Sequence, residues 1–197
     1  MIIVAGGDSF VFGSELKDCP DGRPTSYSRN TFTALLAKDD EYVCTAYPGM
    51  NNSEILNATK SYLDKLHNEY PLLVANVGVV VSWTWPSRNG KVDAIDEVFY
   101  LKNYLQRRKI PFMFTCADNC AFPSLLARYT TMDLSDWFMF PKGDHPHETL
   151  EPRGFYQWAI ENKYEVGPDN HPLEQAHIDA SVLMQEKFNE LVKKHIQ

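Results

Sequence analysis

The sequence predicts an α/β fold: a three-layer α/β/α sandwich around a mainly parallel sheet of five strands, formed as one domain over residues 1–197. Two observations predict it. Short apolar runs bounded by Gly or Pro alternate with segments of helical periodicity, which implies crossover connections and a parallel sheet. The run 72–81 is apolar at nearly every position, as expected of a central strand buried on both faces.

The elements follow in order from these patterns. Asn51 and Glu54 have the spacing of a capping box, so a helix is expected to start there after the turn at Pro48-Gly49. The last segment carries apolar residues at helical spacing and predicts a long C-terminal helix. The expected strands are 1–5, 41–46, 72–81, 111–116 and a short fifth at 137–140, and the other expected helices are 27–38, 92–108, 155–162 and 173–192.

Charge and composition exclude several partners. Lys and Arg number 19 against 26 Asp and Glu, and the net charge of −7 disfavours nucleic acid and anionic membranes. No apolar run reaches the ~18 residues of a membrane span, and the N-terminus lacks a signal-peptide pattern, so we expect a cytoplasmic protein with reduced thiols. The spacing of Cys116 and Cys120 does not match a zinc site. Nothing in the sequence predicts the oligomeric state.

A candidate nucleophile follows the first strand. Ligands of parallel sheets bind at the carboxyl ends of the strands, and Ser9 lies just past such an end, in Gly6-Gly7-Asp8-Ser9. A serine on this turn can act as a nucleophile, with its own N–H as an oxyanion donor. The alternative is a plain turn, because Gly, Asp and Ser are turn formers. Phosphate-binding glycine motifs are absent from the sequence.

Three short blocks together resemble the SGNH/GDSL hydrolase superfamily, whose fold is flavodoxin-like. Gly7-Asp8-Ser9 with Gly13 is similar to its first block, and Gly49 falls at the glycine of the second. Asp169 and His171 precede the C-terminal helix, where the family carries its acid and base. There is also a loose resemblance to small SGNH-like proteins encoded by tailed phages.

The resemblance implies a serine esterase that needs no cofactor. In this reading Ser9 is the nucleophile, His171 the base and Asp169 the acid that orients it. The N–H groups of Ser9 and Gly49 would bind the oxyanion. The third family block, Gly-x-Asn-Asp, is missing; by register Thr84 replaces its Asn and is the expected third oxyanion donor, with Asn51 or Asn52 as substitutes.

The last block also departs from the family, whose spacing is Asp-x-x-His. Asp169 lies only two residues before His171, whereas Asp144 and His147 match the spacing literally and are kept as the second choice. His145 and Glu148 extend that pair into a cluster that is either a metal site or, as we favour, a polar loop. His177 lies on the apolar stripe of the last helix and is expected to be a core histidine.

Aromatic residues follow the third strand at the same edge of the sheet. Trp83, Trp85 and Arg88 are interpreted either as a sugar-stacking platform with a cation or as packing at the rim. The predicted function is hydrolysis of a small O-acyl ester, such as an O-acetylated carbohydrate, through an acyl-enzyme. The partner would then be a small-molecule or glycan ester. The alternative is a catalytically weakened SGNH-fold protein that binds a ligand or glycan.

Overall fold

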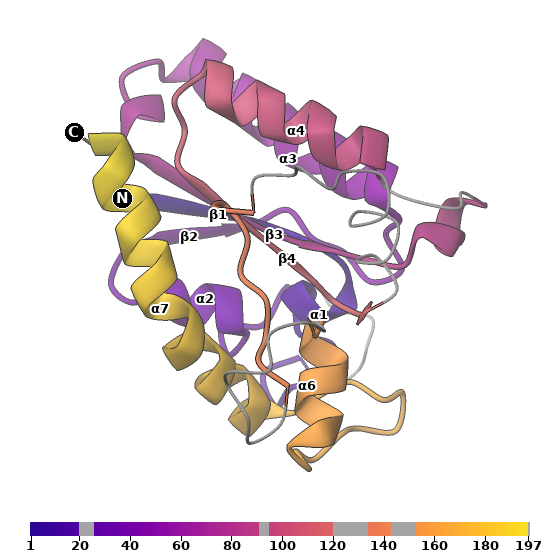
Figure 1. The fold of residues 1–197 in the computed structure, drawn as a ribbon. Helices are drawn as coiled ribbons and strands as arrows, with labels where there is room; N and C mark the ends of the chain where they lie inside the picture. Colours follow the sequence, from indigo (N-terminus) through magenta and orange to yellow (C-terminus); the bar gives the residue numbers. More distant parts are fainter. Residues whose placement is uncertain (20–25, 91–94, 120–133, 143–152, 197) are drawn as a thin grey trace.

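A computed structural model of the chain describes residues 1–19, 26–90, 95–119, 134–142 and 153–196. Its centre is a parallel sheet, and within the described residues this sheet has four strands in the order β2-β1-β3-β4 (Figure 1). The strands are β1 (Ile2–Gly6), β2 (Glu41–Cys44), β3 (Val77–Trp83) and β4 (Phe112–Cys116).

Helices cover both faces of the sheet, as the sequence predicts. On one face lie α2 (Phe32–Ala37), α6 (Phe155–Glu161) and α7 (Glu174–Ile196), and on the other α3 (Asn52–Glu69) and α4 (Ile95–Arg107) (Figure 1). Alternate strand residues serve the two cores: Ile3 and Val80 belong to the first, Val4 and Val79 to the second. The short elements are α1 (Ser9–Phe12), η1 (Val74–Asn76) and η2 (Pro86–Asn89). No helix in the described part of the chain is long and apolar enough to cross a lipid bilayer.

The strand order places a topological switch point beside β1. The chain passes from β1 to β2 on one side and then crosses to β3 on the other, so β1 pairs with both. Gly6, the last residue of β1, pairs with Val81, so β3 runs two residues further than β1 before its own loop begins. Crevices at such switch points are where open α/β sheets bind ligands.

The predicted fifth strand at 137–140 is wrong. Trp137 forms a single parallel bridge with Phe114 of β4, and Phe140 pairs instead with Arg153. Because the backbone of the segment turns to this second partner, it leaves β4 after one bridge and extends no ladder.

The third strand starts later and ends later than predicted. Residues 74–76 form the 3₁₀ turn η1, and Leu72 is 90% exposed, so β3 begins only at Val77. It continues to Trp83, which places that side chain in the sheet rather than in the loop beyond it. The capping box of Asn51 and Glu54 is confirmed at the start of α3.

Candidate active site

Ser9 is the first residue of α1, directly beyond the carboxyl end of β1. Asp8 caps this helix, because its Oδ1 accepts the N–H of Phe10 at 3.1 Å. A Cβ at Gly7 would lie 2.4 Å from Val11 Cγ2, so the turn requires glycine there. First-turn N–H groups have no intrahelical acceptor, which leaves the Ser9 amide available to an oxyanion. The Ser9 residue is 7% exposed.

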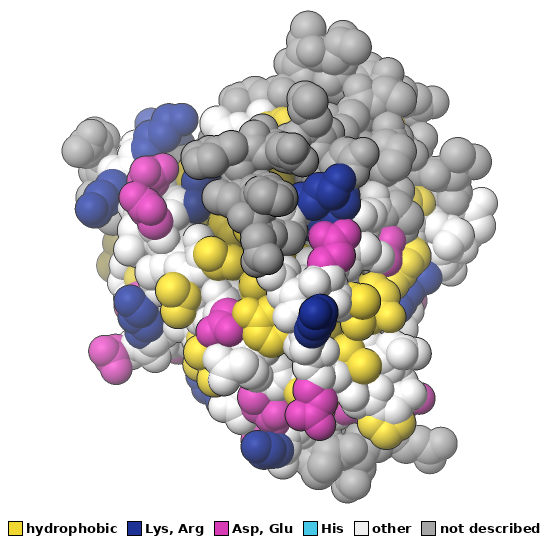
Figure 2. Space-filling view, turned by 60° about the horizontal axis from the view of Figure 1, so that its bottom comes forward, with side chains coloured by type: hydrophobic (Ala, Val, Ile, Leu, Met, Phe, Trp, Pro, Cys, Tyr) yellow, Lys and Arg dark blue, Asp and Glu magenta, His cyan; other side chains and the backbone are white. Residues whose placement is uncertain are grey.

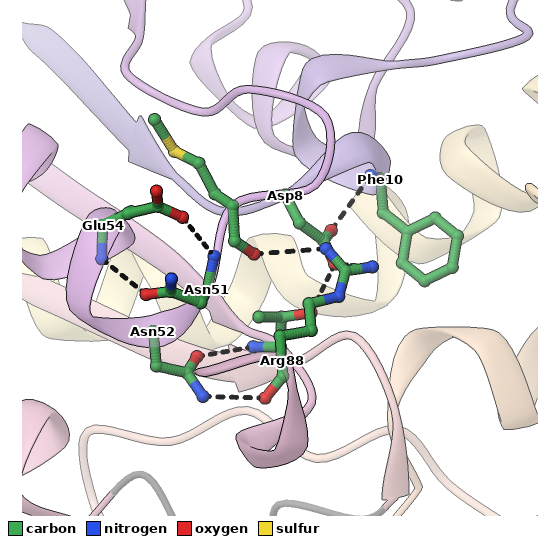
Figure 3. Close-up of polar contacts among 8 residues, drawn as sticks. Asp8, Phe10, Asn51, Asn52, Glu54 and Arg88 are labelled. Atoms are coloured by element: carbon green, nitrogen blue, oxygen red, sulfur yellow. Dashed lines mark hydrogen bonds and ion pairs between the residues drawn. The ribbon is translucent and has the colours of Figure 1, made fainter. Parts of the chain in front are cut away.

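Asp8 is fully buried beneath the turn and holds it to the loop that follows β3 (Figure 3). Its Oδ2 accepts the Thr84 hydroxyl at 2.6 Å and lies 3.5 Å from Arg88 Nη2. Burial raises the pKa of Asp8, while the hydrogen bond from Thr84 and the charge of Arg88 act in the opposite direction. These contacts give Asp8 a structural role in shaping the nucleophile turn.

Thr84 does not occupy the predicted role of third oxyanion donor. Its hydroxyl proton is engaged by Asp8, and the residue is completely buried. The Asn52 amide binds the Thr84 backbone on both sides, accepting its N–H at 2.9 Å and donating to its carbonyl at 3.0 Å (Figure 3). Asn51 in turn caps α3. The Thr84 hydroxyl and the side chains of Asn51 and Asn52 therefore all make structural hydrogen bonds at the place where the family carries its oxyanion-binding Asn.

Gly49 lies in the loop after β2 with a φ of 84°, and nothing approaches within 4 Å of the place where a Cβ would be. Its N–H makes no hydrogen bond with any described residue. Arg88 Nη1 donates to the neighbouring Met50 carbonyl at 3.1 Å (Figure 3), and the same guanidinium reaches Asp8. Arg88 thus links the Gly49 loop to the nucleophile turn, which differs from the substrate-facing cation that the sequence suggested.

His171 is paired with Glu15, not with Asp169. The distance from His171 Nδ1 to Glu15 Oε2 is 2.7 Å. Asp169 is exposed, and only its backbone N–H takes part, donating to Glu15 Oε1 at 3.0 Å. The reason is the short spacing: Asn170 has a φ of 63° in a tight turn closed by the Gly167 N–H and the His171 carbonyl. This turn presents the Asp169 amide, rather than its carboxylate, to the position beside His171.

Glu15 is the residue that sequence reasoning missed. Burial by itself raises the pKa of Glu15, but hydrogen bonds from the Asp169 amide and from His171 bring it below its usual value. A Cβ on Gly167 would lie 2.6 Å from Glu15 Oε2, so the missing side chain there is what lets the carboxylate in. The available signal was an acidic residue six positions after Ser9, two residues beyond the Gly13 of the first block.

The His171 ring lies beside the nucleophile turn. It packs edge-on against Phe10, the residue after Ser9, with 5.3 Å between ring centroids. A neutral His171 that donates its Nδ1–H to Glu15 has an unprotonated Nε2. Within the described residues, neither that nitrogen nor the Ser9 hydroxyl makes a hydrogen bond, either with the other or with a third group.

His177 is a core histidine, as predicted. It is 1% exposed, stacks on Phe32 and accepts the Phe32 N–H at Nδ1 over 3.1 Å. Burial lowers the pKa of His177 to about 3, so the ring is neutral and can accept this hydrogen bond.

The rim residues separate into buried and accessible ones. Trp83 is fully buried on β3 and packs against Phe114 at 5.4 Å, so its predicted place at the rim is wrong. Trp85 is half-buried, 6.0 Å from Phe10, and Arg88 stacks over its ring at 4.8 Å. Tyr156 of α6 stacks parallel to Phe10 at 6.2 Å and was not predicted.

The second-choice pair Asp144 and His147, together with His145 and Glu148, lies outside the described residues.

Comparison with known proteins supports the fold. No protein-family model and no curated protein matches the sequence. The structure is similar to the psychrotrophic esterase EstA from Pseudoalteromonas sp., solved inhibited by monoethylphosphonate, with a TM-score of 0.59 and 12% identity over 98% of each chain. A carbohydrate esterase, described as having divergent catalytic and non-catalytic binding functions, gives a TM-score of 0.46 at 11% identity over 96% of this chain and 64% of that one. The chain thus has an α/β fold similar to that of the esterase EstA, with a four-stranded sheet in its described part.

Proposed function

We propose that this protein is a serine esterase of the SGNH type that hydrolyses a small O-acyl ester through an acyl-enzyme. The observation that carries the proposal is the position of His171 beside the Ser9 turn. Its ring packs on Phe10 while its Nδ1 is bound by a carboxylate, which leaves Nε2 as the basic nitrogen. A nucleophile, a base and an acid behind the base are the parts that acyl transfer requires.

In the proposed reaction Ser9 Oγ attacks the acyl carbonyl carbon and its proton passes to His171 Nε2. The N–H groups of Ser9 and Gly49 stabilise the resulting oxyanion. The tetrahedral intermediate collapses as His171 returns the proton to the leaving alcohol, which leaves an acyl-serine. A water deprotonated by His171 then attacks the acyl-serine, and the carboxylic acid is released as Ser9 regains its proton.

The substrate we propose is an uncharged ester, of which an O-acetylated carbohydrate is the first choice. Trp85 and Tyr156 lie next to Phe10 at the nucleophile turn and offer aromatic rings against which a sugar can stack. The net charge of −7 disfavours a polyanion. On the face drawn in Figure 2, Lys and Arg side chains are interspersed with acidic and hydrophobic ones.

The test is hydrolysis of p-nitrophenyl acetate together with labelling by a serine-reactive fluorophosphonate. We expect the wild type to be labelled and active, and Ser9→Ala to lose labelling and at least ~10³-fold in turnover. Ser14→Ala is the matched control, because the buried Ser14 hydroxyl has no hydrogen-bond partner among the described residues and its loss should change neither result. Labelling that persists in Ser9→Ala, or a wild type without turnover, contradicts the esterase assignment.

A second candidate is an SGNH-fold protein that binds a ligand or glycan with little turnover. The commitment of the Thr84 hydroxyl to Asp8 favours it, since losing one oxyanion donor typically costs ~10²–10³ in rate. This candidate predicts no fluorophosphonate labelling, together with calorimetric binding of an acetylated oligosaccharide that is lost in Trp85→Ala.

A further inference from the structure

We propose that Glu15 is the positioning residue that orients His171 in this reaction and holds it in its reactive tautomer, an inference that rests on the proposed esterase function. The acid would then come from the segment just after the nucleophile, six residues beyond Ser9. The acid of the resembled family comes instead from the loop before the C-terminal helix.

The Glu15 carboxylate binds both the His171 ring and the backbone of the loop that carries it. Glu15 Oε2 lies 2.7 Å from His171 Nδ1 and also accepts the His171 backbone N–H at 3.3 Å. The Asp169 N–H donates to Oε1 at 3.0 Å. A carboxylate at Nδ1 keeps the proton on that nitrogen, leaves Nε2 free to receive the serine proton, and stabilises the imidazolium that forms.

The backbone is shaped to make this contact. Glu15 has a φ of 69°, in the left-handed region that non-glycine residues rarely adopt, and follows Gly13, whose φ is 86°. From the other side, Gly167 makes room for the carboxylate, because a Cβ there would lie 2.6 Å from Oε2. Strain of this kind persists only where surrounding contacts require it, and it gathers at functional sites. The backbone on both sides, at Glu15 and at Gly167, is thus shaped to allow the contact between Glu15 and His171.

The charges around His171 single out Glu15. Electrostatic interactions with this ring are recorded for Glu15, for Asp8 before α1 and for His177 on α7. Asp8 is bound by Thr84 and Arg88, and His177 is neutral in the core. The Asp169 carboxylate makes no hydrogen bond with any described residue. Of these groups, Glu15 is therefore the charged one in direct contact with the His171 ring.

The decisive variant is Glu15→Gln, with Asp169→Asn as the matched control. Gln keeps the length of Glu, and with its carbonyl oxygen at the Oε1 position it can still accept the Asp169 N–H, although the 3.3 Å contact with the His171 N–H is lost. Its NH₂ group then takes the Oε2 position, donates to Nδ1 and favours the tautomer with the proton on Nε2. We expect kcat for p-nitrophenyl acetate to fall by about 10²–10⁴ with KM changed less than about twofold. In Asp169→Asn both constants should stay within about twofold of the wild type.

A second readout needs no catalysis. ¹⁵N NMR of histidine-labelled protein in the Ser9→Ala background reports the tautomer of His171. We expect an Nδ1-protonated neutral ring when Glu15 is present and an Nε2-protonated ring when Glu15 is replaced by Gln. An Nε2-protonated ring with Glu15 present overturns the inference even if the Gln variant fails to fold, and so does a tautomer that changes in Asp169→Asn but not in Glu15→Gln. A wild type without Ser9-dependent hydrolysis overturns the esterase proposal instead, so the two failures are distinguishable.

Discussion

The side-chain amide of Asn52 pairs with the backbone of Thr84 as a neighbouring strand would, through two hydrogen bonds of 2.9 and 3.0 Å. This pairing fastens the first turn of α3 to the residue after β3. Thr84 is in turn bound to Asp8, so the loops after β1, β2 and β3 are held in one arrangement. Oxyanion donors are effective when such contacts fix them beforehand.

Asn52→Ala should lower the free energy of unfolding by about 1–3 kcal/mol, because it leaves a buried N–H and carbonyl of Thr84 without partners. Urea denaturation measures the loss. Asn57→Ala, on the exposed face of the same helix, is the matched control and should be neutral or slightly stabilising. Equal losses in the two variants would mean that the pairing contributes nothing.

Thr84→Val should destabilise the fold by about 1.5–3 kcal/mol, because the buried Asp8 carboxylate loses a charge-assisted hydrogen bond of 2.6 Å. Thr84→Ser keeps the hydroxyl and should recover most of that stability. Denaturation of the three proteins gives the comparison. If Thr84→Ser is as unstable as Thr84→Val, the methyl packing of Thr84 matters more than its hydroxyl.

Arg88→Ala should make the free energy of unfolding fall more steeply as the pH rises from 4 to 8. Asp8 has a raised pKa, so the folded state binds more protons than the unfolded state, and stability falls as pH rises from 3.8 through the folded value. Removing the nearby guanidinium raises the pKa of Asp8 further and extends this loss upward. We expect the deficit against wild type to be larger at pH 8 than at pH 4, by on the order of 1 kcal/mol because Arg88 is partly exposed. Arg88→Lys should show a smaller deficit; a deficit independent of pH would rule out the charge as its cause.

His177 should make the protein sensitive to mild acid. Its pKa is about 3 in the folded state and near 6.5 when unfolded, so the unfolded state binds the extra proton between these values. Its stabilising effect is complete above pH 6.5 and declines toward pH 3, by up to ~1.4 kcal/mol per pH unit. Denaturation midpoints measured between pH 6.5 and 4.5 test this, because carboxylates with ordinary pKa values remain mostly ionised in that window. His177→Asn places an amide oxygen near Nδ1 and should flatten the slope in that window; an unchanged slope would assign the acid sensitivity elsewhere.

Much of the fold could be predicted because it depends on local pattern. The apolar run of β1 and its closing glycines predict where Ser9 emerges, and the Asn51 and Glu54 spacing predicts the start of α3. His177 could be placed in the core from helical periodicity alone. These features depend on residues within a few positions of one another, and local backbone and side-chain geometry is sufficient to produce them.

By itself, then, the sequence determined the α/β class, the serine after the first strand and the histidine before the last helix. The tertiary structure alone decided that Glu15 faces His171 across 156 positions of sequence, and that the Thr84 hydroxyl belongs to Asp8 across 76. It also decided that β3 runs two residues further than predicted, which buries the Trp83 side chain in the core. The physical reason is the same in each case. A local pattern predicts where an element forms, but the partner of a polar side chain depends on which distant segments pack against it.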